Sequence, residues 1–177
     1  MPESNLTGCY VRTFEVDEHF NERDIFIDFW RCRIVFFYLW LNGKMVGYSQ
    51  DSKLNASFDI TDYIQKGQNR IAVQVMRFGA GTYLEDQDYW HLSGIYRDVL
   101  IYAKPRMRIH DYKIETLFSG NYNNAELKVT VAPNNQVNGY GEAHVRLSLY
   151  DSELQLVTEF ETPKFANCDF YLREKNM

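Results

Sequence analysis

An unusual concentration of acidic groups and aromatic rings lies in the middle of the chain. Residues 83–90 read Tyr-Leu-Glu-Asp-Gln-Asp-Tyr-Trp, so Glu85, Asp86 and Asp88 place three carboxylates within four positions. Crowded carboxylates repel one another unless a cation, an arginine or a hydroxyl-rich ligand lies among them. Aromatic rings beside carboxylates are typical of sugar sites, which need apolar faces and hydrogen-bond acceptors. A solvated acidic loop that closes a hairpin would also explain these residues, and both interpretations stay open here.

The composition excludes several classes of protein. The chain has 177 residues and a formal net charge of −5, without a basic stripe that could neutralise phosphates, so nucleic acid is not an expected partner. Hydrophobic residues make up 45% and aromatic residues 16%, which is ample for a folded core. No apolar run approaches the roughly 20 residues that cross a bilayer, and the N-terminus lacks signal-peptide features. A membrane partner is therefore not expected either.

The cysteines and histidines predict no cofactor of their own. Cys9, Cys32 and Cys168 are odd in number and far apart, which argues against a disulfide framework and favours the reducing cytoplasm. The four histidines have no metal-ligand spacing with one another or with the cysteines. A Gly-x-Ser-x-Gly motif and a phosphate-binding loop are also lacking, and residues 78–82 indicate a simple turn.

Short strands separated by turn signals surround the acidic run and predict an all-β sandwich or jelly roll. The strands expected around it are 9–16, 24–29, 35–41, 44–49, 69–77 and 95–103. Asn42 and Gly43 predict a tight hairpin turn, because both residues tolerate positive φ. Residues 57–64 predict a strand that leads into one helical turn, with Thr61 as its N-cap and Gly67 at its end.

Lys104 and Pro105 mark the expected domain boundary, because proline cannot continue a strand ladder. Beyond it, strands are expected at 107–118, 125–132, 143–150 and 154–160. Three or four strands are about half of an immunoglobulin-like sandwich, which needs about seven. The sequence therefore predicts a first domain over residues 1–104 and an incomplete second domain over residues 105–177.

Four stretches of the sequence occur in the order and at the spacing of a known family. They are 7–10 (TGCY), 39–52 (LWLNGKMVGYSQDS), 58–61 (FDIT) and 83–99. Together they resemble the N-terminal half of the large β-galactosidases of glycoside hydrolase family 2. The resemblance is strong over residues 4–104, weaker to about residue 150, and does not extend beyond residue 160.

The resemblance implies a jelly-roll sugar-binding domain, like a galactose-binding domain, over residues 1–104, followed by the start of an immunoglobulin-like domain. It implies a whole enzyme that hydrolyses terminal non-reducing β-D-galactosides such as lactose with retention, using two glutamates on a (β/α)₈ barrel. The barrel and both glutamates are missing from this sequence, as are the strands that open the family's first domain. We therefore expect a fragment with no catalytic residue and no activity alone.

The resemblance assigns a role to Asp88. It matches the family aspartate that reaches into the barrel pocket and binds the region of the galactose 6-hydroxyl together with a sodium ion. The other sodium ligands would come from the barrel, so this carboxylate alone should hold sodium poorly. Magnesium and a homo-oligomeric assembly are implied only for the whole enzyme.

Neighbouring residues have blander expected roles. Glu85 and Asp86 are expected to form hydrogen bonds within the loop or to contact another domain or subunit. Arg97 and Asp98 are expected to form a structural ion pair. Trp40 and Trp90 are expected to be packing anchors rather than sugar platforms.

Two segments depart from the family pattern. Residues 29–36 replace a Gly-Val-x-Ser-x-Phe motif, and Gly-Val-Glu-Ser-Cys-Phe read one nucleotide out of step becomes the Cys-Arg-Ile-Val-Phe found at 32–36. Residues 161–177 match nothing in the family. We therefore hypothesise two slips of the reading frame, which sequencing of the locus would test.

Two alternative functions remain. The chain could be a stand-alone carbohydrate-binding module, for which galactose or lactose binding that is lost on Asp88→Ala is the discriminating observation. It could also be one partner of a split β-galactosidase whose barrel is a separate polypeptide, for which activity restored by co-expression is the discriminating observation.

Overall fold

The computed structural model describes residues 4–30, 36–50, 54–82, 84, 94–120, 122–134 and 144–162, and the backbone of Cys168–Arg173. The chain divides into two compact units, Met1–Pro105 and Arg106–Met177. Apart from two 3-10 turns, η1 (Glu18–Phe20) and η2 (Thr61–Tyr63), the regular elements of the described residues are antiparallel strands. None of the helical turns in these residues is long and apolar enough to span a membrane.

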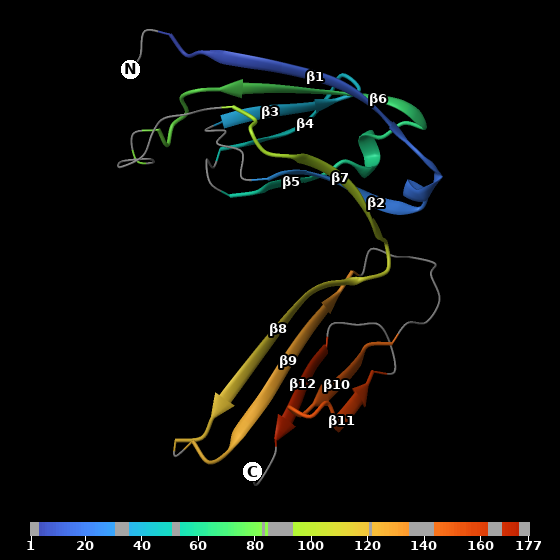
Figure 1. Ribbon diagram of the computed structural model, residues 1–177, viewed down its shortest axis with the longest axis vertical. Coiled ribbons are helices and arrows are strands. Elements are labelled where there is room, and N and C mark those ends of the chain that lie inside the picture. Colours follow the sequence, from blue (N-terminus) through green and yellow to red (C-terminus); the bar gives the residue numbers. More distant parts are fainter. Residues whose placement is uncertain are drawn as a thin grey trace. The chain divides into compact units, whose positions relative to one another are not determined.

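The first unit consists of two sheets (Figure 1). One has the order β1-β6-β3-β4 and the other the order β5-β2-β7. The strands are β1 (Thr7–Val16), β2 (Arg23–Phe29), β3 (Phe36–Leu41), β4 (Lys44–Ser49), β5 (Ala56–Asp59), β6 (Gly67–Met76) and β7 (Val99–Pro105). Their bounds lie close to the predicted ranges, except that β7 begins at Val99 rather than at residue 95.

The core of the first unit is built by alternation along its central strands. In β3 the residues Phe37, Leu39 and Leu41 are buried, whereas the residues between them are partly exposed. The core also contains Ile25, Ile27, Phe29, Ile60, Val73 and Val75. Because side chains of a strand alternate between its two faces, this pattern buries one face of each sheet, as in a sandwich.

The predicted hairpin turn at Asn42 and Gly43 is confirmed, since their φ angles are 51° and 80°. The Asn42 side chain also serves as a tertiary connector. Its Nδ2 donates to Tyr63 O at 2.9 Å and to Asn69 Oδ1 at 2.8 Å, while its Oδ1 accepts from Arg70 N at 2.9 Å. The turn is therefore tied to β6 and to the end of η2.

The predicted capping of η2 is wrong. Ile60 is the N-cap, and the Thr61 N–H donates to Asp59 Oδ1 at 2.9 Å. The Thr61 hydroxyl instead accepts from Ile25 N at 2.9 Å, which ties η2 to β2. At the other end Ile64 is the C-cap, and Gly67, with φ of 83°, begins β6. The Thr61 hydroxyl thus makes a tertiary hydrogen bond to β2 and does not cap η2.

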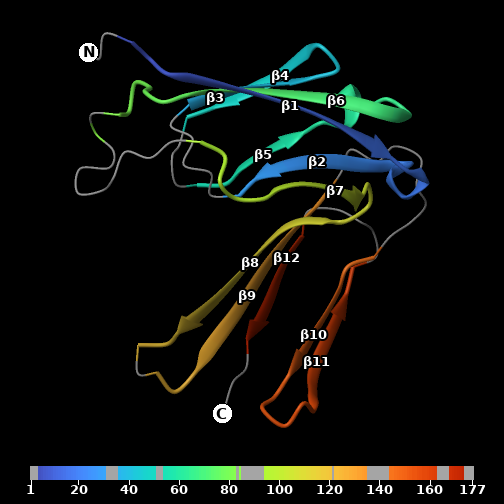
Figure 2. The ribbon, with the colours of Figure 1, turned by 45° about the horizontal axis from the view of Figure 1, so that its top comes forward.

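The second unit contains a three-stranded sheet of order β12-β9-β8 and a hairpin formed by β10 and β11 (Figure 2). The strands are β8 (Ile109–Phe118), β9 (Ala125–Pro133), β10 (Arg146–Tyr150), β11 (Leu156–Glu161) and β12 (Cys168–Arg173). β12 was not predicted from the sequence. Val129, Val131 and Val145 are the buried core, with Leu127 and Leu147 packed against them.

Candidate functional site

The predicted site residue Asp88 lies outside the described residues, as do Glu85, Asp86 and Trp90. The predicted sodium contact of Asp88 therefore remains a prediction. Within the described residues no group of three or more His, Cys, Asp and Glu could hold a metal ion. The structure does describe the two ends of the segment that carries Asp88.

The first end is pinned by the N-terminal segment. Asn5 Nδ2 donates to Phe78 O at 2.8 Å, and Phe78 N donates to Asn5 Oδ1 at 3.0 Å. Arg77 N donates to Leu6 O at 3.0 Å, and the Arg77 guanidinium lies 5.3 Å from the Phe78 ring centroid. These paired contacts fix the backbone immediately before the acidic run.

A tight turn follows, as predicted for residues 78–82. Gly79 N donates to Thr82 Oγ1 at 2.8 Å, and Thr82 N donates to Gly79 O at 3.2 Å. Leu84 N donates to Gly81 O at 2.9 Å. The buried Thr82 side chain thus has a backbone donor, which removes the cost of burying its hydroxyl.

The second end of the segment begins at Gly94. Its φ of 129° lies in a region that L-amino acids rarely adopt, and a Cβ there would lie 3.6 Å from the hydroxyl oxygen of Tyr10. Glycine therefore allows the chain to return beside β1.

The described contacts of Arg97 and Asp98 are with other groups, and their predicted ion pair remains a prediction. The Arg97 guanidinium lies 5.8 Å from the ring centroid of Tyr96, a favourable cation–π arrangement. Asp98 contributes its backbone instead, because its carbonyl accepts from Trp30 N at 3.3 Å.

A cluster of aromatic rings, not predicted from the sequence as a group, covers part of the outer face of β3 and β4. The ring centroids of Tyr38 and Trp40 lie 5.7 Å apart, and those of Tyr38 and Tyr48 lie 6.3 Å apart. Phe36 packs on Tyr38 at 4.8 Å. Tyr48 is 56% exposed and Gln74 lies opposite Tyr38 in register, so rings and an amide share this surface. The available signal was β3 itself, which is apolar on both faces.

The rings of this outer aromatic cluster do not form one flat platform. Tyr38 is inclined by 48° to Trp40 and by 57° to Tyr48. A sugar could therefore stack on one ring at a time, with the tyrosine hydroxyls as polar groups.

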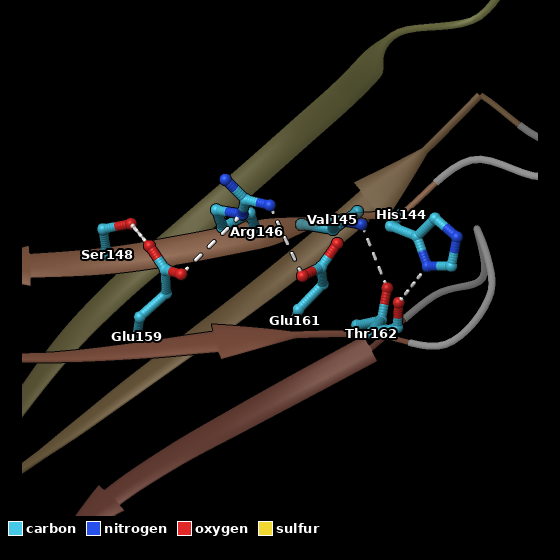
Figure 3. Close-up of polar contacts among 7 residues, drawn as sticks. All are labelled: His144, Val145, Arg146, Ser148, Glu159, Glu161 and Thr162. Carbon is cyan, nitrogen blue, oxygen red and sulfur yellow. Dashed lines mark hydrogen bonds and ion pairs between the residues drawn. The ribbon is translucent and has the colours of Figure 1, made fainter.

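A polar cluster lies on the hairpin of the second unit (Figure 3). Arg146 Nε lies 3.8 Å from Glu159 Oε1, and Arg146 Nη2 lies 3.5 Å from Glu161 Oε2. Ser148 Oγ donates to Glu159 Oε2 at 2.8 Å. One guanidinium thus neutralises two exposed carboxylates, which connects β10 to β11 but does not prepare either acid for proton transfer.

The open end of this hairpin is closed by Thr162 (Figure 3). Val145 N donates to Thr162 Oγ1 at 3.0 Å, and His144 Nδ1 donates to Thr162 O at 2.7 Å. Because a carbonyl can only accept, this contact assigns a proton to His144 Nδ1. The histidine has a structural role in the hairpin.

The strands described above place the chain among the all-β proteins, and solved structures with a similar arrangement of strands exist. A Bacteroides uniformis β-glucuronidase superposes with a TM-score of 0.73 at 21% identity, over 97% of this chain and 22% of that chain. A Bifidobacterium dentium β-glucuronidase complexed with coumarin-3-O-glucuronide gives 0.67 at 19% identity, over 95% and 33%. The predicted fold class, a jelly-roll sandwich followed by a partial immunoglobulin-like sandwich, is confirmed.

The sequence comparisons define the family. The family model described as "Glycosyl hydrolases family 2, sugar binding domain" matches residues 1–105. β-Galactosidases of Yersinia pestis and Yersinia pseudotuberculosis are 42% identical over 92% of this chain. The chain belongs to glycoside hydrolase family 2 and contains its sugar-binding domain. It spans 16% of the length of these relatives.

Proposed function

We propose that this chain is the non-catalytic, sugar-binding portion of a β-galactosidase. The whole enzyme would hydrolyse terminal non-reducing β-D-galactosides such as lactose with retention of configuration. The observation that carries the proposal is the 42% identity to β-galactosidases over 92% of the chain, combined with the family match over residues 1–105. For the same whole enzyme we propose sodium, magnesium, a homo-oligomeric assembly and a cytoplasmic location.

The chemistry of the described acids supports the non-catalytic part of the proposal. Retaining glycosidases need two carboxyl groups about 5–5.5 Å apart, one of which carries a proton when the reaction begins. Glu159 and Glu161 share Arg146, and Glu115 pairs with Lys113 at 2.8 Å. The hydrogen bond from Lys113 lowers the pKa of Glu115, so this carboxyl does not hold the proton that a general acid must carry.

We assign substrate binding to Asp88, as one acceptor in a pocket that the rest of the enzyme completes. The two described ends of its segment support this role, because hydrogen bonds between Asn5 and Phe78 and the approach of Gly94 to Tyr10 fix where the segment starts and ends. Fixed ends limit the positions that an acid between them can reach. Sodium would need oxygens beyond this one carboxylate.

The first experiment measures hydrolysis of a nitrophenyl β-galactoside by the purified full chain. We expect no turnover above buffer. The chain is then co-expressed with a polypeptide that carries the remaining part of a β-galactosidase relative. Restored turnover that is lost with Asp88→Ala and kept with Asp62→Ala, a change of an exposed acid on η2, supports the assignment. Turnover by the chain alone would contradict the proposal.

The outer aromatic cluster favours a second candidate, a stand-alone carbohydrate-binding module. Exposed Tyr48 beside Tyr38 and Trp40 offers ring faces to a sugar. Titration of the full chain with lactose, followed by NMR, would detect this binding. Binding of lactose by the isolated chain would favour the module. Its loss with Asp88→Ala would locate the sugar at Asp88, and its loss with Tyr48→Ala would locate it on the outer aromatic cluster.

A further inference from the structure

The edge of the second unit's larger sheet is a long strand. β8 is ten residues long and ends the order β12-β9-β8, so one of its sides faces no other described strand (Figures 1 and 2). The backbone groups of such an edge are a template for pairing with another strand. The side chains of β8 determine which strand would fit.

One face of β8 extends the core outward without being covered. Tyr112 lies opposite Val131 in register and Ile114 opposite Val129, so each pair shares a face of the sheet. The two valines are 4% and 3% exposed, whereas Tyr112 is 65% and Ile114 59% exposed. The apolar surface therefore continues to the edge of the sheet.

The backbone direction at this edge follows from Tyr112. Its N–H donates to Asp111 Oδ1 at 2.8 Å and so points away from β9. Since N–H and C=O groups alternate in direction along a strand, Ile114 and Thr116 also present theirs to the open side. An incoming strand would exchange hydrogen bonds with these alternate residues.

The two charged residues beside Ile114 have opposite signs, so they can pair with the same two residues of a second, antiparallel copy of β8. Lys113 and Glu115 flank Ile114 and form an ion pair at 2.8 Å, with side chains that are 69% and 32% exposed. If two copies of β8 are aligned antiparallel with Ile114 facing Ile114, Lys113 of each copy faces Glu115 of the other. The same alignment places Tyr112 opposite Thr116.

We propose that β8 is a self-association edge, through which two copies of this chain pair antiparallel about Ile114 and join their β12-β9-β8 sheets into one. Hydrogen bonds form at Ile114 and between Tyr112 and Thr116, where the Tyr112 N–H exchanges its bond to Asp111 Oδ1 for one to the Thr116 carbonyl of the second copy. Lys113 and Glu115 then meet at the intervening positions, where opposite Cα atoms lie only about 4.5 Å apart and side chains interact most closely.

A second copy fits this edge for two physical reasons. The charge pattern is its own complement about Ile114, whereas alignments that place Lys113 opposite Lys113 or Glu115 opposite Glu115 bring like charges together. Pairing also places the exposed Ile114 side chains of both copies side by side on the same face, so each shields part of the other from water. The hydrogen bond from Lys113 keeps the pKa of Glu115 below its ordinary value, which favours the charged form of this carboxyl.

The test uses sedimentation velocity of the full chain over a range of concentrations. We expect a concentration-dependent dimer. Lys113→Glu and Glu115→Lys should each weaken the association about tenfold or more, because two like-charge contacts replace two attractive ones. Lys66→Glu, which changes the net charge by the same amount as Lys113→Glu but at an exposed site of the first unit, should have little effect.

An equimolar mixture of the two single variants provides the decisive measurement. Lys113→Glu carries two acids and Glu115→Lys two bases, so their heterodimer has opposite charges at both contacts. The double variant Lys113→Glu/Glu115→Lys should likewise dimerise as the parent does. Amide exchange at Ile114 should slow as the dimer forms.

Three results would overturn the proposal. One is a parent chain that stays monomeric throughout, and another is a parent dimer that both single reversals leave intact. The third is a mixture of the single variants that stays as monomeric as each variant alone. Far-UV circular dichroism of each variant confirms that the strands are retained before association is compared.

Discussion

The two units of the chain use the same alternating strand pattern but cover their apolar faces to different extents. In the first unit Phe37, Leu39 and Leu41 of β3 are buried between two sheets. In the second unit Val129 and Val131 of β9 are buried under the hairpin, while residues beside them on β8 are exposed. Alternation thus makes a strand amphipathic, but burial requires a second layer opposite that strand.

The polar networks of Asn69 in the first unit and Arg146 in the second also differ in burial, being buried in the first unit and exposed in the second. Asn69 of the first unit is buried at 1% exposure, with hydrogen bonds to Gln65, Gly67 and Asn42. In the second unit the contacts between Arg146 and the hairpin glutamates are exposed to water. A hydrogen bond or ion pair in water contributes less than one whose loss would leave a buried group unsatisfied. We therefore expect substitutions to cost more in the first unit.

The largest expected effect is in the core of the first unit. Leu39 is 0% exposed, so Leu39→Ala should lower the free energy of unfolding by about 3–4 kcal/mol through lost burial and a residual cavity. Tryptophan fluorescence during urea unfolding measures this, because Trp30, Trp40 and Trp90 all lie in the first unit.

The matched change in the second unit is Val131→Ala. It removes two buried carbons and should cost about 1.5 kcal/mol, at roughly 0.8 for each. Exchange of amides in β9 measures it, since this unit contains no tryptophan. Equal costs for Leu39→Ala and Val131→Ala would break the comparison between the units.

The next effect concerns the buried polar network. Asn69→Ala removes the acceptor of Gln65 N and Asn42 Nδ2 and the donor to Gln65 O and Gly67 O. We expect a loss of about 2 kcal/mol, because partly buried backbone groups lose their partners. Urea unfolding followed by tryptophan fluorescence measures it. The exposed neighbour Gln68→Ala is the control and should change stability by less than about 0.5 kcal/mol.

Alanine substitutions at one glycine in each unit test the same comparison with a smaller expected change in stability. A Cβ on Gly47 would lie 3.0 Å from Phe58 Cε1, and the Phe58 ring is itself packed against Phe29 and Phe37. Gly47→Ala should therefore cost about 1 kcal/mol net, as overpacking outweighs the entropy gained by replacing glycine. Gly120→Ala in the second unit is the comparison, because no atom of the described residues lies within 4 Å of a Cβ built on Gly120. Thermal unfolding of the two variants measures the difference. A neutral Gly47→Ala would show that the core around Phe58 can move.

The smallest effect is electrostatic. The hydrogen bond from Lys113 lowers the pKa of Glu115, so Lys113→Met should return that pKa toward its ordinary value. A lowered pKa contributes stability above the unfolded-state pKa, and this contribution is lost as the pH falls through the lowered value. NMR titration of the Glu115 carboxyl measures the shift at protein concentrations low enough to avoid association. An unchanged pKa in Lys113→Met would contradict the assigned cause.

Much of the fold could be predicted because its signals are local. The range 44–49 predicted for a strand is that of β4, and Asn42 and Gly43 have the positive φ angles expected of a hairpin turn. The error at η2 arose where a distant partner competes with a local one. The Thr61 hydroxyl accepts from Ile25 N, 36 positions away, rather than capping η2. This partner could not be deduced from spacing in the sequence.

The candidate site could be predicted only in part. The sequence singles out Asp88 by resemblance, and the structure describes the contacts that hold both ends of its segment. Asn5 was missed because its partner Phe78 is 73 positions away and no motif connects them. The outer aromatic cluster was missed because its rings come from two strands, although the doubly apolar β3 indicated that its outer face is unusual.

The sequence by itself determined most of the strands, the hairpin turn and the family, because these follow from alternation, backbone preference and the order and spacing of its motifs. Only the tertiary structure decided which apolar residues are buried. Val129 and Ile114 are both β-branched residues of strands with an alternating pattern. They are partners in register on neighbouring strands, so they lie on the same face of the sheet. One is covered and the other is exposed, because burial depends on what lies opposite a residue and not on the residue itself.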